Sequence, residues 1–292
     1  MPKVSVVIPC FNLGKYIHEA IDSVMAQTFQ DFEITVVNDG STDIETNLIL
    51  ESLDNSKIKV IKTDNQGLAA ARNNGIAQAA GKYILPLDAD DKIADTYLEK
   101  AVSILDENEN VGIVYCRAEF FDRENFKWDL PKYELSRILI DNLIFCSAFF
   151  RKTDWETVGG YKSSMIYGWE DYEFWLSIIE LKREVYQIPE HLFFYRQRSD
   201  SMANIMSREH LFYSHKEIVK NHKNLYLDNI EHIYKYIYSL RDIITEQQQY
   251  QSVRDGEIHN LNSEISNLNK QLSSARGLIR LLIKSIAKKI GF

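Results

Sequence analysis

At 292 residues, the chain is long enough for one large domain with an appendage. Its hydrophobic content of 45% is ordinary for a folded protein, and a net charge of −8 argues against general nucleic-acid binding, which favours a basic surface. No run approaches the roughly 20 apolar residues that a membrane span needs, and the short run before Pro9 does not resemble a secretory signal. We therefore expect a cytoplasmic protein that binds no nucleic acid.

The three cysteines, Cys10, Cys116 and Cys146, lie singly in apolar, strand-like runs. Their spacing matches no zinc motif, and an odd number of scattered cysteines is typical of a reducing compartment. We expect them to pack as small hydrophobic side chains.

Four apolar, β-rich runs alternate with helical patterns over the first hundred residues. After Pro9 ends the first run, apolar side chains recur at helical spacing from Tyr16 to Val24. Turn formers from Asn38 to Asp43 end the second run and cap another helix. The alternation predicts a parallel, doubly wound α/β sheet with its site beyond the carboxyl ends of the strands. We expect strands at Val4–Ile8, Phe32–Val37, Ile58–Ile61 and Lys82–Leu87, and an alanine-rich helix at Leu68–Ala80.

From about Val111 the alternation is less regular, which favours a mixed sheet. The predicted elements are strands at 112–115, 146–150 and 192–195, a long polar surface loop at 122–133 and a helix at 169–179. We place the two halves of this domain at about 1–110 and about 111–210.

Beyond residue 210 a heptad pattern begins. Isoleucine and leucine step by three and four from Ile230 to Ile244 and, after the polar residues Gln247, Gln251 and Arg254, resume in phase from Ile258 to Leu272. A repeat that keeps phase across an interruption predicts one long helix in a helical region at 211–275. Isoleucine at a and leucine at d favour a parallel homo-oligomer, although residues 230–244 alternatively pack on the preceding domain.

The last segment, 276–292, forms a basic, amphipathic pattern. It holds five basic residues and no acid. Because the whole chain has a net charge of −8, residues 1–275 have a net charge of −13. Arg276, Arg280, Lys284 and Lys288 are spaced by four and form one stripe, which is typical of helices that bind an anionic membrane surface. The alternative is a continuation of the heptad helix with a solvated basic face.

The run Tyr83–Pro86 leads into Leu87 and three aspartates, Asp88, Asp90 and Asp91. Carboxylates at the end of a buried strand do not stay buried unpaired, so we expect them at a solvent-open edge. Two of them suit Mg²⁺ or Mn²⁺ held together with substrate phosphates. Asp91 is alternatively the N-cap of a helix starting near Ala94.

Several other residues suit the transfer of a group from a nucleotide. Phe11 is placed to face a base, and Asp39 to accept from a uracil-type N–H, unless Phe11 is core and Asp39 only closes a turn before Gly40. Arg72, one turn into a helix after Gly67, suits phosphate, with a surface ion pair as the alternative. Glu170 and Asp171 open a helix beside Trp169, where acids are either dipole-stabilised or a general base.

Six ordered motifs resemble the inverting glycosyltransferases of family 2, which have the GT-A fold. The resemblance covers about residues 3–205. The motifs are Pro9-x-Phe11-Asn12, Asn38-Asp39-Gly40-Ser41-Thr42-Asp43, Asn65-x-Gly67-x-x-x-Ala71-Arg72-Asn73-x-Gly75, Leu87-Asp88-Ala89-Asp90-Asp91, Trp169-Glu170-Asp171 and Tyr195-Arg196-x-x-x-x-Ser201-Met202.

The resemblance implies a role for each matching residue. Asp88 contacts ribose, Asp90 binds the metal, and Asp171 is the general base beside Glu170. Arg196 and Ser201 belong to a late loop that closes on the pyrophosphate. A histidine often found in that loop, near the position of Arg198, is absent between Arg196 and Met202. The residues implied to bind the nucleoside and phosphates are Pro9, Phe11, Asn12, Asp39, Asn65 and Arg72.

We therefore expect an inverting, metal-dependent hexosyl- or N-acetylhexosaminyl-transferase that uses a nucleotide sugar. Asp39 favours UDP, and the basic tail favours a glycan or polyprenyl-linked glycan acceptor at the inner face of the cell membrane. We assign nucleotide binding to the half at about 1–110 and the acceptor to the half at about 111–210, with the polar loop at 122–133 touching the acceptor. A nucleotidyltransferase fits less well, because Pro9–Gly14 has one glycine and no arginine. The alternative from a different class is a non-catalytic, membrane-associated scaffold on a degenerate transferase domain, against which the retained acids argue.

Overall fold

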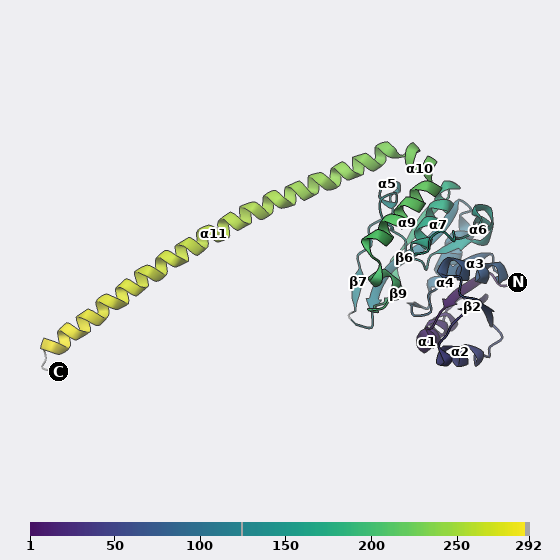
Figure 1. The fold of residues 1–292 in the computed structure, drawn as a ribbon, viewed down its shortest axis with the longest axis horizontal. Coiled ribbons are helices and arrows are strands. Elements are labelled where there is room, and N and C mark those ends of the chain that lie inside the picture. Colours follow the sequence, from purple (N-terminus) through teal and green to yellow (C-terminus); the bar gives the residue numbers. More distant parts are fainter. Residues whose placement is uncertain (124, 290–292) are drawn as a thin grey trace. The chain divides into compact units, whose positions relative to one another are not determined.

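The structure, a computed structural model, describes residues 1–123 and 125–289. Within its helices, the side chains at 203, 275, 278, 279 and 281–289 lie outside the described set. The chain divides into two compact units, Met1–Ile233 and Tyr234–Phe292. The first contains a sheet with its helices, and the second belongs to one long helix (Figure 1).

The first four strands are parallel and follow the order β3-β2-β1-β4. Right-handed crossovers in this order place α1 and α2 on one face of the sheet and α3 on the other. Gly75 lets α3 approach closely, because a Cβ there would collide with Val7 of β1. The structure thus confirms the prediction that the sheet begins with four parallel strands. The elements are β1 (Val4–Cys10), α1 (Gly14–Met25), β2 (Phe32–Asp39), α2 (Ile44–Glu51), β3 (Ile58–Thr63), α3 (Leu68–Gln78) and β4 (Tyr83–Pro86).

The sheet continues as β4-β8-β6-β9-β5 with mixed directions, as expected. β8 is antiparallel to both β4 and β6, whereas β6 and β9 run parallel. These elements are β5 (Lys92–Ile93), α4 (Tyr97–Glu107), β6 (Val111–Phe121), β7 (Phe126–Trp128), α5 (Leu135–Ile138), β8 (Phe149–Arg151), α6 (Lys152–Val158), α7 (Glu170–Glu180) and β9 (Glu184–Arg196).

Two predicted segments of this half differ from the structure. The strand expected at 146–150 is the short β8, and the residues just before it form a loop, because β8 pairs with β4 only at Tyr83 and Ile84. The expected surface loop contains β7, which pairs with β6, and its Trp128 stacks on Phe120 at a centroid distance of 4.9 Å. Pairing with β6 thus places a strand in a segment that we predicted to be a loop.

Three more helices belong to the first unit, which therefore extends beyond residue 210 to Ile233. They are α8 (Met202–Ile205), α9 (Arg208–Asn221) and α10 (Lys223–Asp228). His222, buried where α9 meets α10, lies 3.0 Å from Glu180 and 3.4 Å from the buried Glu173 of α7. These contacts attach α9 and α10 to the helix that carries Asp171.

The last element, α11 (Ile230–Lys289), is a single helix that continues through the polar interruption. This confirms the predicted long helix. Its a and d side chains from Ile237 to Ile244 and from Ile258 to Leu272 are exposed, so their pairing stays a prediction. Much of the basic tail, including the side chains at 281–289 and all of 290–292, lies outside the described set. In the described part of the chain, no helix combines the length and apolar character that a membrane crossing requires.

Candidate active site

A cavity of about 930 Å³ lies in the first unit, at the carboxyl ends of the parallel strands. It is lined by the loops after β1, β2 and β4, by the start of α7 and by the segment after β9. All predicted site residues except Asn12 and Arg196 border it. Those brought together are Pro9, Phe11, Asp39, Asn65, Arg72, Asp88, Asp90, Glu170, Asp171 and Ser201.

Asn12 connects two loops instead of lining the cavity. Its backbone is left-handed, with φ of 56°, and its side-chain oxygen accepts from the backbone N–H groups of Thr42 and Asp43, both at 2.9 Å. A second bond runs from its amide nitrogen to the Thr42 hydroxyl at 3.2 Å. Asn12 therefore positions the loop that carries Phe11.

Arg196 does not line the cavity, unlike Ser201, the other residue predicted in the late loop. Its buried guanidinium donates from Nε to the Asp90 carbonyl at 2.8 Å and pairs with Glu19 at 3.0 Å. Arg198, two residues later, lines the cavity and donates from Nη1 to Asp90 Oδ2 at 2.8 Å. In an extended chain, residues two positions apart point to the same face, so Arg196 and Arg198 would be expected to lie together. The chain turns after β9 ends at Arg196, and only Arg198 lines the cavity. From the sequence, position 198 is notable only for its missing histidine, and Arg198 is not predicted as a site residue.

Asp39 anchors the turn that opens α3. Its buried carboxylate accepts from the Thr63 hydroxyl at 3.0 Å and from the backbone N–H groups of Gln66 and Gly67 at 3.2 and 3.1 Å. The alternative turn before Gly40 is formed by Asn38 Oδ1, which accepts from the Ser41 N–H at 3.0 Å. Phe11 is 42% exposed and borders the cavity, so it is not a core residue.

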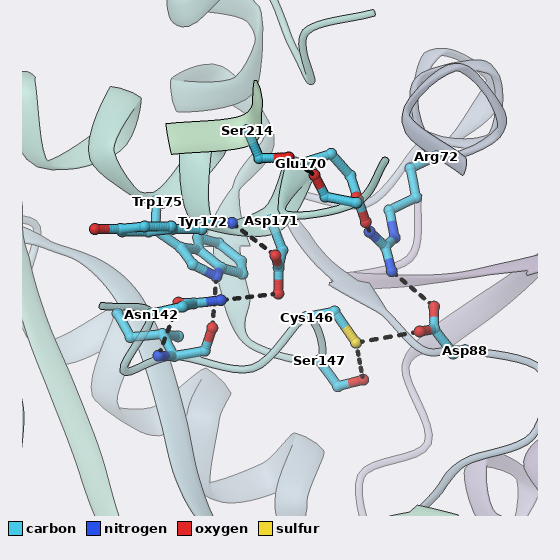
Figure 2. A network of polar contacts seen from close by, with 12 residues as sticks. Arg72, Asp88, Asn142, Cys146, Ser147, Glu170, Asp171, Tyr172, Trp175 and Ser214 are labelled. Carbon is cyan, nitrogen blue, oxygen red and sulfur yellow. Dashed lines mark hydrogen bonds and ion pairs between the residues drawn. The ribbon is translucent and has the colours of Figure 1, made fainter. Parts of the chain in front are cut away.

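Arg72 joins the two halves of the site, as Figure 2 shows. It is 1% exposed and pairs with Asp88 at 2.7 Å and with Glu170 on the start of α7. Burial alone would lower the pKa of Arg72, but the carboxylates of Asp88 and Glu170 raise it well above its usual value. The arginine is therefore permanently charged and is not the surface ion pair that the sequence left open.

The three aspartates after β4 have different surroundings. Asp91 is buried and accepts the Arg196 backbone N–H at 2.9 Å, while Thr96 occupies the N-cap position of α4, so Asp91 is not its cap. Burial and the charge of Asp88 raise the pKa of Asp90, against the opposing effect of Arg198. Carboxylate oxygens are the donors that Mg²⁺ and Mn²⁺ prefer, and a cation here would offset the repulsion between Asp88 and Asp90. This donor set fits a hard divalent cation.

Cys146 borders the cavity instead of packing in the core. Its sulfur lies 3.4 Å from Asp88 Oδ2 and 3.6 Å from the Ser147 hydroxyl (Figure 2). Ligand atoms of Asp88, Asp91 and Cys146 lie within 4.8 Å of one another. Burial raises the pKa of Cys146 well above its usual value, so its thiol stays protonated and donates to Asp88.

Asp171 occupies the first turn of α7, after two consecutive left-handed residues, Gly168 with φ of 102° and Trp169 with φ of 66°. Burial first, and then the neighbouring Glu170, raise the pKa of Asp171 to about 7. A carboxylate with a pKa near neutrality both accepts a proton readily and is ionised in a large fraction of molecules at pH 7. This is the electrostatic state that a general base needs.

Part of the cavity wall is apolar. Trp128, Leu130 and Pro131 come from the segment that we expected to lie on the surface, and Met202 and Ile205 come from α8. The cavity therefore combines acidic and arginine side chains with an apolar wall.

Comparisons with known proteins find relatives by sequence and by structure. The family model described as glycosyl transferase family 2 matches residues 5–168. An uncharacterised glycosyltransferase of Rickettsia prowazekii is 33% identical over 192 residues, covering 62% of this chain and 59% of that protein. An uncharacterised glycosyltransferase of Haemophilus influenzae is 40% identical over 110 residues, covering 37% of this chain and 44% of that protein.

Among solved structures, residues 1–349 of S. aureus TarS in complex with UDP-GlcNAc align with a TM-score of 0.60 and 23% identity, over 70% of this chain and 62% of that chain. This likeness confirms the expected GT-A fold. The chain thus spans 59% of the length of the Rickettsia prowazekii relative.

Proposed function

The chain belongs to glycosyl transferase family 2, and we propose that it transfers a sugar, with inversion, from a UDP-sugar to a hydroxyl of a glycan or lipid-linked glycan. One observation carries the proposal: Asp171, with a pKa of about 7, borders the same cavity as Asp39, Arg72, Asp88 and Asp90. The residues proposed for the donor site and for the base thus border one cavity.

The donor end supplies the binding groups. Phe11 and Asp39 face the nucleoside, with Pro9 and Asn65 beside them, and Asp88 accepts from the ribose. Asp90 would hold a divalent cation, which would supply positive charge to the diphosphate leaving group. Arg198 and Ser201 border the same end, so we assign Arg198 the phosphate-facing role that the sequence gave to Arg196.

The base acts on the acceptor. Asp171 takes the proton of the acceptor hydroxyl as its oxygen forms a bond to the anomeric carbon of the sugar. The bond from that carbon to the diphosphate oxygen breaks, and the nucleoside diphosphate leaves with the electron pair. Attack from the side opposite the leaving group inverts the configuration, and Arg72, by holding both Asp88 and Glu170, keeps donor and base in register.

A thermal-shift panel of UDP, dTDP, GDP and CMP, each with and without Mn²⁺, tests the donor site. A ligand at 100 times its dissociation constant stabilises the fold by roughly 2.7 kcal/mol. We expect a Mn²⁺-dependent shift with UDP that Asp90→Ala abolishes. A folded protein that responds to none of the nucleotides would instead favour a non-catalytic scaffold.

We also propose that α11 pairs with a second copy of the chain and that residues 276–292 bind the anionic inner face of the cell membrane. The exposed heptad side chains support the pairing. The basic stripe in the sequence, of which Arg276 and Arg280 are described and exposed, supports the membrane contact.

A further inference from the structure

Asn142, on the loop between α5 and β8, contacts the proposed base directly. Its Nδ2 donates to Asp171 Oδ2 at 3.3 Å, while Asp171 Oδ1 accepts from the Tyr172 backbone N–H at 2.7 Å (Figure 2). Each carboxylate oxygen thus has one donor, and each keeps a lone pair that can face the cavity. The plane of the carboxylate is set by these two bonds.

The orientation of the Asn142 amide is fixed by its other contacts. Its Oδ1 accepts the backbone N–H of Ile144 at 3.2 Å, so its NH₂ group must be the end that faces Asp171. A flipped amide would lose the bond to Ile144 and place its oxygen against the carboxylate. In this orientation, Asn142 can only donate a hydrogen bond to Asp171.

The loop that carries Asn142 is attached to the same helix as the base. Trp175 of α7 donates from Nε1 to the Ile144 carbonyl at 3.0 Å, and the hydroxyl of Tyr172 donates to the Ile138 carbonyl. Both side chains are fully buried. Two residues of α7 thus hold the loop on either side of Asn142, and Asn142 in turn holds Asp171.

We propose that Asn142 is a positioning residue for sugar transfer, which orients the carboxylate of Asp171 and favours its ionised form. This inference rests on the proposed function, in which Asp171 is the base. An N–H donor to a carboxylate stabilises only the charged form, so it opposes the burial that favours the protonated form. Without Asn142, the base would be ionised in a smaller fraction of molecules at neutral pH.

The test measures the pKa of Asp171 in the full chain by NMR with ¹³C-carboxyl-labelled aspartate, its signal being identified by its loss in Asp171→Asn. We expect Asn142→Leu to raise this pKa by about one unit, the size of one hydrogen bond to a charged group. Asn142→Asp should raise it further, because it places a second carboxylate there while keeping an acceptor for the Ile144 N–H. Asn55→Asp, which adds the same charge at an exposed turn, should leave it unchanged.

Two further readouts separate this inference from the proposed function. The thermal shift with UDP and Mn²⁺ should be equal in wild type and Asn142→Asp. The rate of UDP release from UDP-GlcNAc should fall about ten-fold in the variant at pH 7, and the acid limb of the pH–rate profile should move to higher pH. No UDP shift in the wild type would contradict the proposed function alone, since the NMR titration still judges Asn142. An unchanged pKa of Asp171 in both Asn142 variants would overturn the inference, whatever the activity.

Discussion

The raised pKa of Asp171 suits its proposed role as a base but lowers the stability of the folded state above a certain pH. Its pKa of about 7 in the folded protein exceeds the ordinary value of 3.8, because burial and Glu170 disfavour the charged form. Well below pH 3.8 the group is protonated in both the folded and the unfolded chain and costs nothing. As pH rises from about 4 to 7, the unfolded chain ionises first, so the folded state loses up to about 4 kcal/mol.

We therefore expect Asp171→Asn to raise the melting temperature at pH 7.5 and to leave it nearly unchanged at pH 4, while UDP release from a UDP-sugar falls on the order of 10²–10⁴-fold. Calorimetry across this pH range and a nucleotide-release assay measure the two effects. Asp54→Asn, at an exposed loop position, is the control and should show no pH-dependent gain. A variant that is as active as the wild type would remove Asp171 from the role of base.

At the scale of the element, the start of α7 depends on backbone that few residues tolerate. Gly168 has φ of 102°, and a Cβ there would lie 2.9 Å from Met206 Cε and 3.2 Å from Met202 Sδ. Trp169 then adopts the left-handed region as well, which is uncommon for a bulky side chain. Residues held in such conformations cost about 1–3 kcal/mol and are kept where the surrounding structure demands them.

Gly168→Ala should accordingly destabilise the fold by roughly 1–3 kcal/mol and displace Glu170 and Asp171, so that transfer is lost more completely than UDP binding. Chemical denaturation and the UDP thermal shift measure the two effects. Gly159→Ala is the matched control, since Gly159 also has a positive φ, of 75°, but its Cβ would meet only Lys162 Nζ at 3.7 Å. Equal losses in the two variants would mean that backbone strain, and not the contact with α8, constrains the turn.

Some of the elements around this site can be predicted from the sequence, and others cannot. Apolar runs and turn formers place the four parallel strands correctly, since central strands are buried on both faces and leave a local signal. The same signal misplaces the strand at 146–150 and hides β7, whose strand character comes from pairing with β6. Arg198 and Asn142 were missed for a related reason: their roles arise from contacts with Asp90 and Asp171, which lie far away in the chain.

At the scale of the whole molecule, α11 is a helix of 60 residues whose apolar stripe has no partner among the described residues of its own unit. An isolated helix gains little from propensity alone, so most of its stability must come from packing of that stripe. The a positions Ile258 and Ile265 and the d positions Leu261 and Leu268 are about half exposed. Isoleucine at a and leucine at d is the pattern of two-stranded, parallel pairing.

We therefore expect the full chain to sediment as a dimer and the double variant Ile258→Lys, Ile265→Lys to sediment as a monomer, because lysines at facing a positions bring like charges into the seam. The matched control places two lysines on the outer face of the same heptad, at His259 and Ser263, and should stay dimeric. Because Met1–Ile233 is a compact unit with its own core, the monomeric variant should still show the UDP thermal shift. A wild type that sediments as a monomer at micromolar concentration would show that the stripe serves another partner, and a variant that loses UDP binding would show that pairing supports the cavity itself.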